Sequence, residues 1–238
     1  MSTDTLGFET PIIYEDEARN PSTGNPLVAA HTSMTHCSPG YEISKRLFDL
    51  VVALSAVLLL SPVFAVIAVA IKLTSPGPIL FRQKRLGRNG ELFWCFKFRT
   101  MVCGAEQRLQ QSPELRKQFE QNYKLKNDPR LTRIGSFLRT TSLDELPQFL
   151  NVVRSDMSII GPRPIVPPEI SKYGPYGDKL LTVKPGLGGM WQAMGRSDTS
   201  YTQRIELDMA YIDSCSLGLD IRLFISTILA VIKIRGAY

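Results

Sequence analysis

Two adjacent carboxylates, Asp144 and Glu145, are the residues whose types and spacing best suit chemistry. They stand in the run Ser142-Leu143-Asp144-Glu145-Leu146-Pro147-Gln148. Arginines are frequent on both sides of the pair: Arg130, Arg133, Arg139, Arg154 and Arg163. Nearby cations and a helix N-terminus would keep Asp144 ionised and hold a phosphate group close to it. An ionised carboxylate can attack phosphorus, and two acids together with phosphate oxygens can hold Mg²⁺.

The same acids also have a purely structural interpretation. Pro147 is tolerated only in the first turn of a helix, which puts Asp144 near an N-cap. Ser142 and Glu145 have the spacing of a capping box, and acids in a first turn suit the helix dipole. The residues alone leave capping and catalysis both open.

Histidine chemistry is a poor candidate because of where the histidines stand. The chain has 238 residues and a net charge of +6, but residues 1–40 hold five acids and one cation, Arg19. His31 and His36 both lie in this acidic leader, which shows no helix or strand periodicity. If the leader is a tail, the main body has no imidazole, which disfavours Ser-His-Asp catalysis, Cys-His catalysis and histidine-bound zinc.

Further candidate ligand contacts lie between residues 161 and 201, in loops rich in glycine and proline. In Gly161-Pro162-Arg163-Pro164 the prolines limit backbone freedom, which suits Arg163 to forked phosphate contacts. Lys184 opens Lys184-Pro185-Gly186-Leu187-Gly188-Gly189, a loop whose backbone amides could approach a diphosphate. The remaining candidates are Arg196, Asp198 and Arg204. Ordinary loop or salt-bridge roles explain each of these residues equally well.

An apolar segment between Leu50 and Ile71 is expected to place this chemistry at a membrane. Its 22 consecutive residues carry no charge, which exceeds the roughly 20 apolar residues that cross a bilayer. Ser61-Pro62, near its middle, predicts a sharp kink that leaves each half too short to cross alone. Cations, which favour the cytoplasmic side, flank both ends: Lys45, Arg46, Lys72, Arg82 and Lys84. These features favour a re-entrant hairpin over a kinked spanning helix or a buried core helix.

Around this segment the sequence predicts an α+β fold that is mainly helical. Residues 1–43 are expected to be a disordered tail, residues 44–75 a membrane-embedded helix-break-helix, and residues 76–238 a small cytoplasmic catalytic domain. β-rich runs at 79–84 and 92–98, separated by a turn, predict a short β-hairpin. The apolar stretch 221–232 is too short to span a bilayer and predicts a helix that lies in the membrane interface, as an amphipathic helix, or packs in the core.

Six runs of the sequence, taken together and in order, are highly specific. They are Lys45-Arg46-Leu47-Phe48-Asp49, Arg82-Gln83-Lys84-Arg85-Leu86-Gly87, Lys97-Phe98-Arg99-Thr100-Met101, the run from Ser142 to Gln148, Gly161-Pro162-Arg163-Pro164, and Lys184-Pro185-Gly186. They closely resemble the motifs of the bacterial sugar transferases, which are monotopic phosphoglycosyl transferases. The resemblance covers the chain from about residue 44 to its C-terminus.

The resemblance implies a UDP-sugar donor, an undecaprenyl phosphate acceptor and Mg²⁺. By analogy, Asp144 attacks the sugar-bearing phosphorus, releases UMP and carries the sugar phosphate until undecaprenyl phosphate takes it. Glu145 would help Asp144 to hold Mg²⁺ or assist the acceptor, and Arg139 and Arg163 would bind phosphate. The product would begin exopolysaccharide, capsule or O-antigen synthesis.

The resemblance also implies a place in the cell. The chain would lie in the bacterial cytoplasmic membrane, with its catalytic domain facing the cytoplasm, Ser61-Pro62 as the re-entrant kink, and Lys45 and Arg46 at the lipid headgroups. The short form looks most like galactose- or glucose-1-phosphate transferases, although Gly188 and Ser197 depart from the family pattern and leave the sugar open.

Two other functions are weighed against this one. A non-catalytic membrane-docked scaffold of a polysaccharide assembly complex would release no nucleotide. A glycosyltransferase that forms a glycosidic bond would release UDP rather than UMP. Nucleic acid is not expected as a partner, because the basic residues are scattered through loops without a recognised binding motif. A homodimer is left open.

Overall fold

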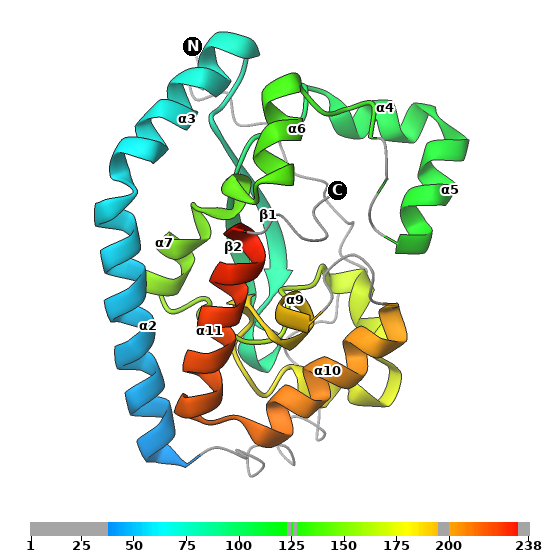
Figure 1. Cartoon of the computed structure of the whole chain (residues 1–238). Coiled ribbons are helices and arrows are strands. Elements are labelled where there is room, and N and C mark those ends of the chain that lie inside the picture. Colours follow the sequence, from blue (N-terminus) through cyan, green and yellow to red (C-terminus); the bar gives the residue numbers. More distant parts are fainter. Residues whose placement is uncertain (1–37, 123–124, 126–127, 195–199, 233–238) are drawn as a thin grey trace, which may run out of the picture.

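The computed structural model describes residues 38–122, 125, 128–194 and 200–232. These residues form a mainly helical fold with two small two-stranded sheets, which confirms the expected α+β class (Figure 1). The helices are α2 (Pro39–Leu59), α3 (Ser61–Thr74), α4 (Ala105–Gln111), α5 (Pro113–Asn122), α6 (Arg133–Thr140), α7 (Gln148–Val153), α8 (Gly177–Leu180), α9 (Met190–Met194), α10 (Tyr201–Ser214) and α11 (Leu217–Ile232). The strands are β1 (Leu80–Leu86), β2 (Leu92–Phe98), β3 (Ser158–Ile160) and β4 (Gly186–Gly188), and 3₁₀ turns occupy Arg88–Gly90 (η1), Leu143–Glu145 (η2) and Pro167–Tyr176 (η3).

The first described helix begins earlier than the expected end of the tail at residue 43. Residues 1–37 of the expected tail lie outside the described part of the chain. Helix α2 already begins at Pro39, with the Ser38 hydroxyl accepting a hydrogen bond from the Tyr41 amide as its N-cap. The first turn of α2 therefore includes residues that were expected to belong to the tail.

The kink predicted at Ser61-Pro62 is present in the structure. Helices α2 and α3 meet at Leu60 with a bend of 59°. Pro62 has no amide hydrogen for the carbonyl of Leu58, and the Ser61 hydroxyl donates to that carbonyl instead, at 2.8 Å. Within the described residues no single helix has the length and apolar character to cross a membrane, whereas this bent pair meets both criteria when taken together.

The outer surface of the bent pair is apolar and exposed. Leu58, Leu59 and Leu73 are 74%, 75% and 81% exposed. A helix in the core of a domain buries such side chains, so the buried core helix that the sequence left open is wrong. The described apolar side chains of α2 and α3 present a surface that water solvates poorly.

Both arms of the bent pair are attached to the same folded body. Helix α2 packs along α7, and the guanidinium of Arg46 donates to the carbonyls of Val152 and Val153 at 2.7 and 2.9 Å. Helix α3 packs on α6 and buries Ile67 and Ile71 in a small core with Phe98 and Leu138. In Figure 1, α2 runs along one side of the molecule with α7 beside it.

The expected hairpin is present as antiparallel β1 and β2. Gln83 lies opposite Cys95, so the odd-numbered residues of the two strands share one face. That face packs on the main core through Phe93 and Cys95, whereas Leu92 on the other face is 54% exposed. The same inward face carries Arg85 and Lys97, which brings two cations from the hairpin into the interior.

The hairpin is fixed to α7 by one buried amide. The Asn151 side chain accepts a hydrogen bond from the Phe96 amide at 3.0 Å and donates to the Trp94 carbonyl at 2.7 Å. Asn151 is fully buried. Because α7 follows the acid pair directly, this contact sets the distance between the acids and β2.

The C-terminal helix is longer than expected, because α11 begins at Leu217 rather than near residue 221. Its inward side buries Leu223 and Asp220, and Phe224 contacts Phe48 of α2 edge to face. Its outward side is apolar, with Ile225 52% exposed. Apolar side chains thus occupy both sides of α11, and its place in a membrane interface stays a prediction.

Candidate active site

The acid pair does not cap a helix. Asp144 and Glu145 lie in the 3₁₀ turn η2 between α6 and α7, and Ser142 before them has a positive φ of 59° and makes no capping hydrogen bond. The capping box that the spacing indicated is therefore wrong, because Ser142 has a left-handed backbone in place of the extended one typical of an N-cap and its side chain bonds no amide of the turn. Such backbone strain in a residue other than glycine gathers at functional sites.

Helix α6 delivers Arg139 to the same place. The α6 N-cap Thr132 and the Arg139 guanidinium both contact Thr100, with Arg139 Nε 3.1 Å from its hydroxyl. A Cβ atom on Gly135 would lie 1.9 Å from the Thr100 carbonyl oxygen, so only glycine permits this approach. Burial lowers the pKa of Arg139, while the negative charge of Asp144 opposes that shift.

Lys97 of β2 pairs directly with the second acid. Its ammonium lies 2.6 Å from Glu145 Oε1. Burial opposes the ionisation of Glu145, but Lys97, and after it Arg163, outweigh burial and lower the pKa of Glu145 to about 2. Glu145 is therefore ionised throughout the neutral range.

Asp144 is in the opposite electrostatic state. It is 7% exposed, and burial, reinforced by the charge of Glu145 and opposed by Lys97 and Arg139, raises its pKa to about 6. At pH 7 to 8 the carboxylate is mostly ionised, but it is desolvated and raised in energy. A buried anion of raised pKa is a stronger nucleophile than a solvated one.

Two further arginines reach the acids from the loops and the hairpin. Arg163 and Arg85 both contribute to the low pKa of Glu145. Arg163 stacks over the Trp191 ring with its guanidinium carbon 5.7 Å from the ring centre. Arg85 donates to the Pro164 carbonyl at 3.0 Å and so holds the loop that carries Arg163. The acids thus face Lys97, Arg139, Arg163 and Arg85.

Sequence reasoning missed Lys97, Arg85 and Asn151 as members of the site. The two cations could have been found from the alternation of side chains along the hairpin strands. Arg85 and Lys97 lie on the same face as Phe93 and Cys95, which pack in the core. Asn151 had no comparable signal, because its role depends on where α7 meets the edge of β2.

The loops between residues 161 and 189 pair with each other rather than forming a cradle. The Gly186 amide donates to the Pro162 carbonyl, and the Gly161 amide donates to the Gly188 carbonyl. A Cβ on Gly186 would lie 2.1 Å from the Gly161 nitrogen. Gly161 and Gly186 therefore serve the close backbone pairing of β3 with β4, and the Gly186 amide is already hydrogen-bonded there. The approach of the Gly188 and Gly189 amides to a diphosphate stays a prediction.

Several predicted binding residues lie elsewhere. Lys184 lines a cavity with Arg46 and Arg88 and donates to the Ser155 hydroxyl. Arg204 is buried, with its guanidinium 3.4 Å from Glu169, and it lies over the same Trp191 ring as Arg163. Its ligand contact stays a prediction. Arg196 and Asp198 lie outside the described residues.

The two cations assigned to lipid headgroups have partners inside the protein. Lys45 lies 2.9 Å from the buried carboxylate of Asp220, and Arg46 is bound to the last carbonyls of α7. Their place in the structure is therefore the joint between α2 and the body, because both charges are already neutralised or hydrogen-bonded there. Their contact with lipid headgroups stays a prediction.

The acid pair fits Mg²⁺ only in part. The described residues contain no group of three or more His, Cys, Asp or Glu side chains that could hold a metal ion. Mg²⁺ commonly binds through one or two carboxylates and completes its shell with water and substrate phosphates. Asp144 and Glu145 supply such a pair of carboxylates, although Lys97 already occupies one oxygen of Glu145. The remaining Mg²⁺ ligands would therefore have to come from water and from the phosphates of a substrate.

Comparisons with known proteins identify the family of the chain. The family model described as "Bacterial sugar transferase" matches residues 40–234. The UDP-galactose-lipid carrier transferase of Erwinia amylovora is 44% identical over 82% of this chain and 41% of its own length. The exopolysaccharide production protein ExoY of Sinorhizobium fredii is 42% identical over 82% of this chain and 88% of its own.

A third relative is the UDP-glucose:undecaprenyl-phosphate glucose-1-phosphate transferase of Escherichia coli, 39% identical over 90% of this chain and 45% of its own length. The chain thus spans less than half of the Erwinia and Escherichia proteins and most of ExoY. The matched region contains the bent helix pair, the hairpin and the acid pair. The chain belongs to the bacterial sugar transferase family.

Proposed function

We propose that the chain is a phosphoglycosyl transferase, which moves hexose-1-phosphate from a UDP-sugar to undecaprenyl phosphate and releases UMP. The names of the Erwinia and Escherichia relatives support this reaction class. ExoY supports a place in exopolysaccharide production. The transfer would be the first membrane step of exopolysaccharide, capsule or O-antigen synthesis.

One observation carries the proposal: four cations surround two carboxylates, one of which is buried with a raised pKa. The cations are Lys97, Arg139, Arg163 and Arg85. Their excess of positive charge complements a diphosphate, and the fixed guanidinium groups suit forked contacts to its oxygens. The buried carboxylate among them is poised to attack phosphorus.

The first step is a displacement at the sugar-bearing phosphorus. An Asp144 carboxylate oxygen forms a bond to that phosphorus, and the bond to the bridging oxygen breaks, so that UMP leaves with the bonding electrons. The product is a sugar-phosphoryl aspartate. Arg139 and Arg163 would stabilise the charge that develops on the phosphate oxygens and on the departing UMP.

The second step returns the enzyme to its starting state. A phosphate oxygen of undecaprenyl phosphate attacks the same phosphorus, the bond to Asp144 breaks, and the sugar leaves on a lipid diphosphate. Glu145, held ionised by Lys97, would orient the acceptor or help Asp144 to bind Mg²⁺. When bound, Mg²⁺ would neutralise phosphate charge.

The product nucleotide separates this function from its rivals. Purified full-length protein with undecaprenyl phosphate and Mg²⁺ is offered UDP-glucose, UDP-galactose or UDP-N-acetylglucosamine, and released UMP and UDP are quantified. We expect UMP from UDP-galactose or UDP-glucose. UDP in place of UMP would indicate a glycosyltransferase that forms a glycosidic bond, and no nucleotide from any donor would favour the scaffold.

A re-entrant position of the bent pair in the cytoplasmic membrane is part of the proposal. The exposed apolar surface of α2 and α3 supports contact with lipid. Because α2 packs on α7 and α3 packs on α6, both arms are held by one body, which cannot lie on both sides of a bilayer. The exposed apolar side of α11 would lie in the interface beside them, with membrane lipids as partners.

The topology predicts equal access to both flanks. Exposed Gly40 lies in the first turn of α2 and exposed Glu91 follows α3. Gly40→Cys and Glu91→Cys are therefore each placed in a chain without its four native cysteines. We expect a membrane-impermeant maleimide to label neither cysteine in intact bacterial spheroplasts and both after permeabilisation. Labelling of one site alone in intact spheroplasts would show a spanning helix and contradict the hairpin.

A further inference from the structure

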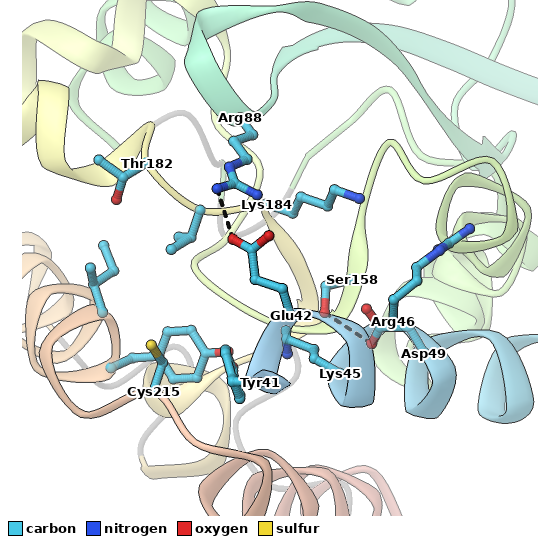
Figure 2. A pocket seen from close by; sticks show the side chains of 13 residues that line it. Tyr41, Glu42, Lys45, Arg46, Asp49, Arg88, Ser158, Thr182, Lys184 and Cys215 are labelled. Carbon is cyan, nitrogen blue, oxygen red and sulfur yellow. Dashed lines mark hydrogen bonds and ion pairs between the residues drawn. The ribbon is translucent and has the colours of Figure 1, made fainter. Parts of the chain in front are cut away.

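A cavity of about 100 Å³ lies between α2, the hairpin turn η1, the loop before β4 and the end of α10 (Figure 2). Four cationic side chains line it: Lys45, Arg46, Arg88 and Lys184. Two carboxylates, Glu42 and Asp49, also line it, with Val183 and Ile212 in its apolar wall. The described residues that line this cavity do not include the acid pair or the cations around it, so the two sites are separate.

Three of the charged groups are fixed parts of the wall. Arg46 is bound to the α7 carbonyls, and Lys45 is paired with buried Asp220. The Asp49 carboxylate accepts hydrogen bonds from the Ser158 hydroxyl and the Ile159 amide at 3.0 and 2.9 Å. These interactions join α2 to the body and leave Arg88, Lys184 and Glu42 as the adaptable groups.

Burial and two neighbouring guanidinium groups disfavour the charge of Lys184, and the carboxylates of Asp49 and Glu42 only partly offset them. Its hydrogen-bond partner is a neutral hydroxyl, that of Ser155. Burial, and after it the like charge of Arg46, lower the pKa of Lys184. A cation in this position gains from an added anion, because the anion restores the interactions that burial and the neighbouring guanidinium remove.

Arg88 has an acidic partner that can be displaced. Its guanidinium lies 2.9 Å from Glu42 Oε1, and the two side chains are 31% and 45% exposed. Figure 2 shows this pair at the cavity, with the Glu42 carboxylate directed toward Arg88. Exposed ion pairs of this kind contribute little stability, so another anion can take the place of Glu42 on Arg88.

We propose that this cavity is a second anion site, which binds a phosphate monoester through Lys184 and Arg88 in competition with Glu42. A phosphate monoester carries close to two negative charges at neutral pH and accepts several hydrogen bonds, which matches two cations better than one carboxylate does. The phosphate could be supplied by a soluble molecule or by a lipid headgroup.

Two variants of the cavity should change its affinity for phosphate in opposite directions. Full-length protein is titrated with inorganic phosphate or UMP in detergent at constant ionic strength, and separately reconstituted in nanodiscs with phosphatidic acid or with phosphatidylcholine alone. The melting temperature reports binding. We expect Lys184→Gln to weaken binding about tenfold and Glu42→Gln to tighten it about threefold. Lys179→Gln, which removes a cation paired with Asp213 outside the cavity, should change nothing.

The outcomes separate this site from the acid pair. Stabilisation by phosphate or UMP in detergent identifies a soluble ligand, and stabilisation by phosphatidic acid alone identifies a lipid. Either result supports the site if Asp144→Asn retains the stabilisation and Lys184→Gln weakens it, and stabilisation that Lys184→Gln retains in full overturns the proposal. An effect lost in Asp144→Asn but kept in Lys184→Gln places the anion at the acid pair and overturns the proposal. Equal loss in Lys179→Gln, or no stabilisation by any probe, also overturns it. If Lys184→Gln does not fold, Arg88→Gln at the exposed turn replaces it with the same expected loss.

Discussion

Replacing Asp144 with asparagine abolishes UMP formation and at the same time makes the protein more stable at neutral pH. Loss of the nucleophile removes the first displacement, so we expect activity to fall on the order of 10⁴-fold or more. The side chain keeps its shape, and the cations around it remain. UMP release from the preferred UDP-sugar is the measurement for activity, and thermal unfolding at pH 7.5 is the measurement for stability.

The gain in stability follows from the sign of the pKa shift. Burial raises the pKa of Asp144 from 3.8 to about 6, so the folded protein holds this proton more tightly than the unfolded chain does. Ionisation of Asp144 therefore costs stability, a cost that grows between about pH 4 and pH 6 and is complete above that range. Asparagine cannot ionise, so its melting temperature exceeds that of the wild type at pH 7.5 and approaches it at pH 4.

Glu145→Gln is the matched control, with an effect of opposite sign. The pKa of Glu145 is lowered to about 2, so its ionised form stabilises the fold above its ordinary pKa of 4.5. We expect Glu145→Gln to lower the melting temperature at pH 7.5. A folded Asp144→Asn protein with wild-type UMP release would remove Asp144 from the mechanism, and lower stability in both variants would contradict the assigned electrostatic states.

Replacing Lys97 with methionine should have the second largest effect. Burial raises the pKa of both acids, and the charge of Lys97 is the largest influence that lowers it. Loss of Lys97 should therefore raise the pKa of Asp144 and of Glu145. Activity should fall about 10²- to 10³-fold, as when one preorganised charge is removed from a transition state. The acid limb of the pH–rate profile should move to higher pH, because Asp144 must be ionised to attack.

Lys84→Met controls for the loss of a hairpin lysine. Lys84 lies on the opposite face of β1 and stacks over Trp94, with its ammonium 5.7 Å from the ring centre. We expect its pH profile to match that of the wild type. Lys97→Arg should recover part of the activity and restore the acid limb. An unchanged acid limb in Lys97→Met would show that Lys97 serves only the packing of the hairpin.

The sequence predicted well those features that depend on local patterns. The kink at Ser61-Pro62 follows from the missing proline donor, and the hairpin follows from two β-rich runs around a turn. The choice of Asp144 and Glu145 followed from residue types, but the sequence left capping open. Ser142 decides against capping through its backbone angle, which no spacing rule reveals.

Features that depend on long-range packing escaped prediction. Lys184 and Arg163 stand in similar Gly- and Pro-rich loops, yet only Arg163 acts on Glu145, because β3 and β4 pair side by side and direct the two residues to different places. Lys45 flanks an apolar run, and that position gives no sign of its ion pair. Its partner Asp220 is distant in sequence, and only the packing of α11 on α2 brings the two together.

The sugar-phosphoryl aspartate is the central claim, and one measurement addresses it directly. Purified protein is mixed with its UDP-sugar and Mg²⁺ without undecaprenyl phosphate, and UMP and the intact protein mass are followed together. The account predicts a burst of about one UMP per enzyme and a mass gain of one hexose phosphate, both absent in Asp144→Asn and reversed by adding undecaprenyl phosphate. UMP that forms only when undecaprenyl phosphate is present, with no gain in protein mass, would show a single direct displacement and contradict the account.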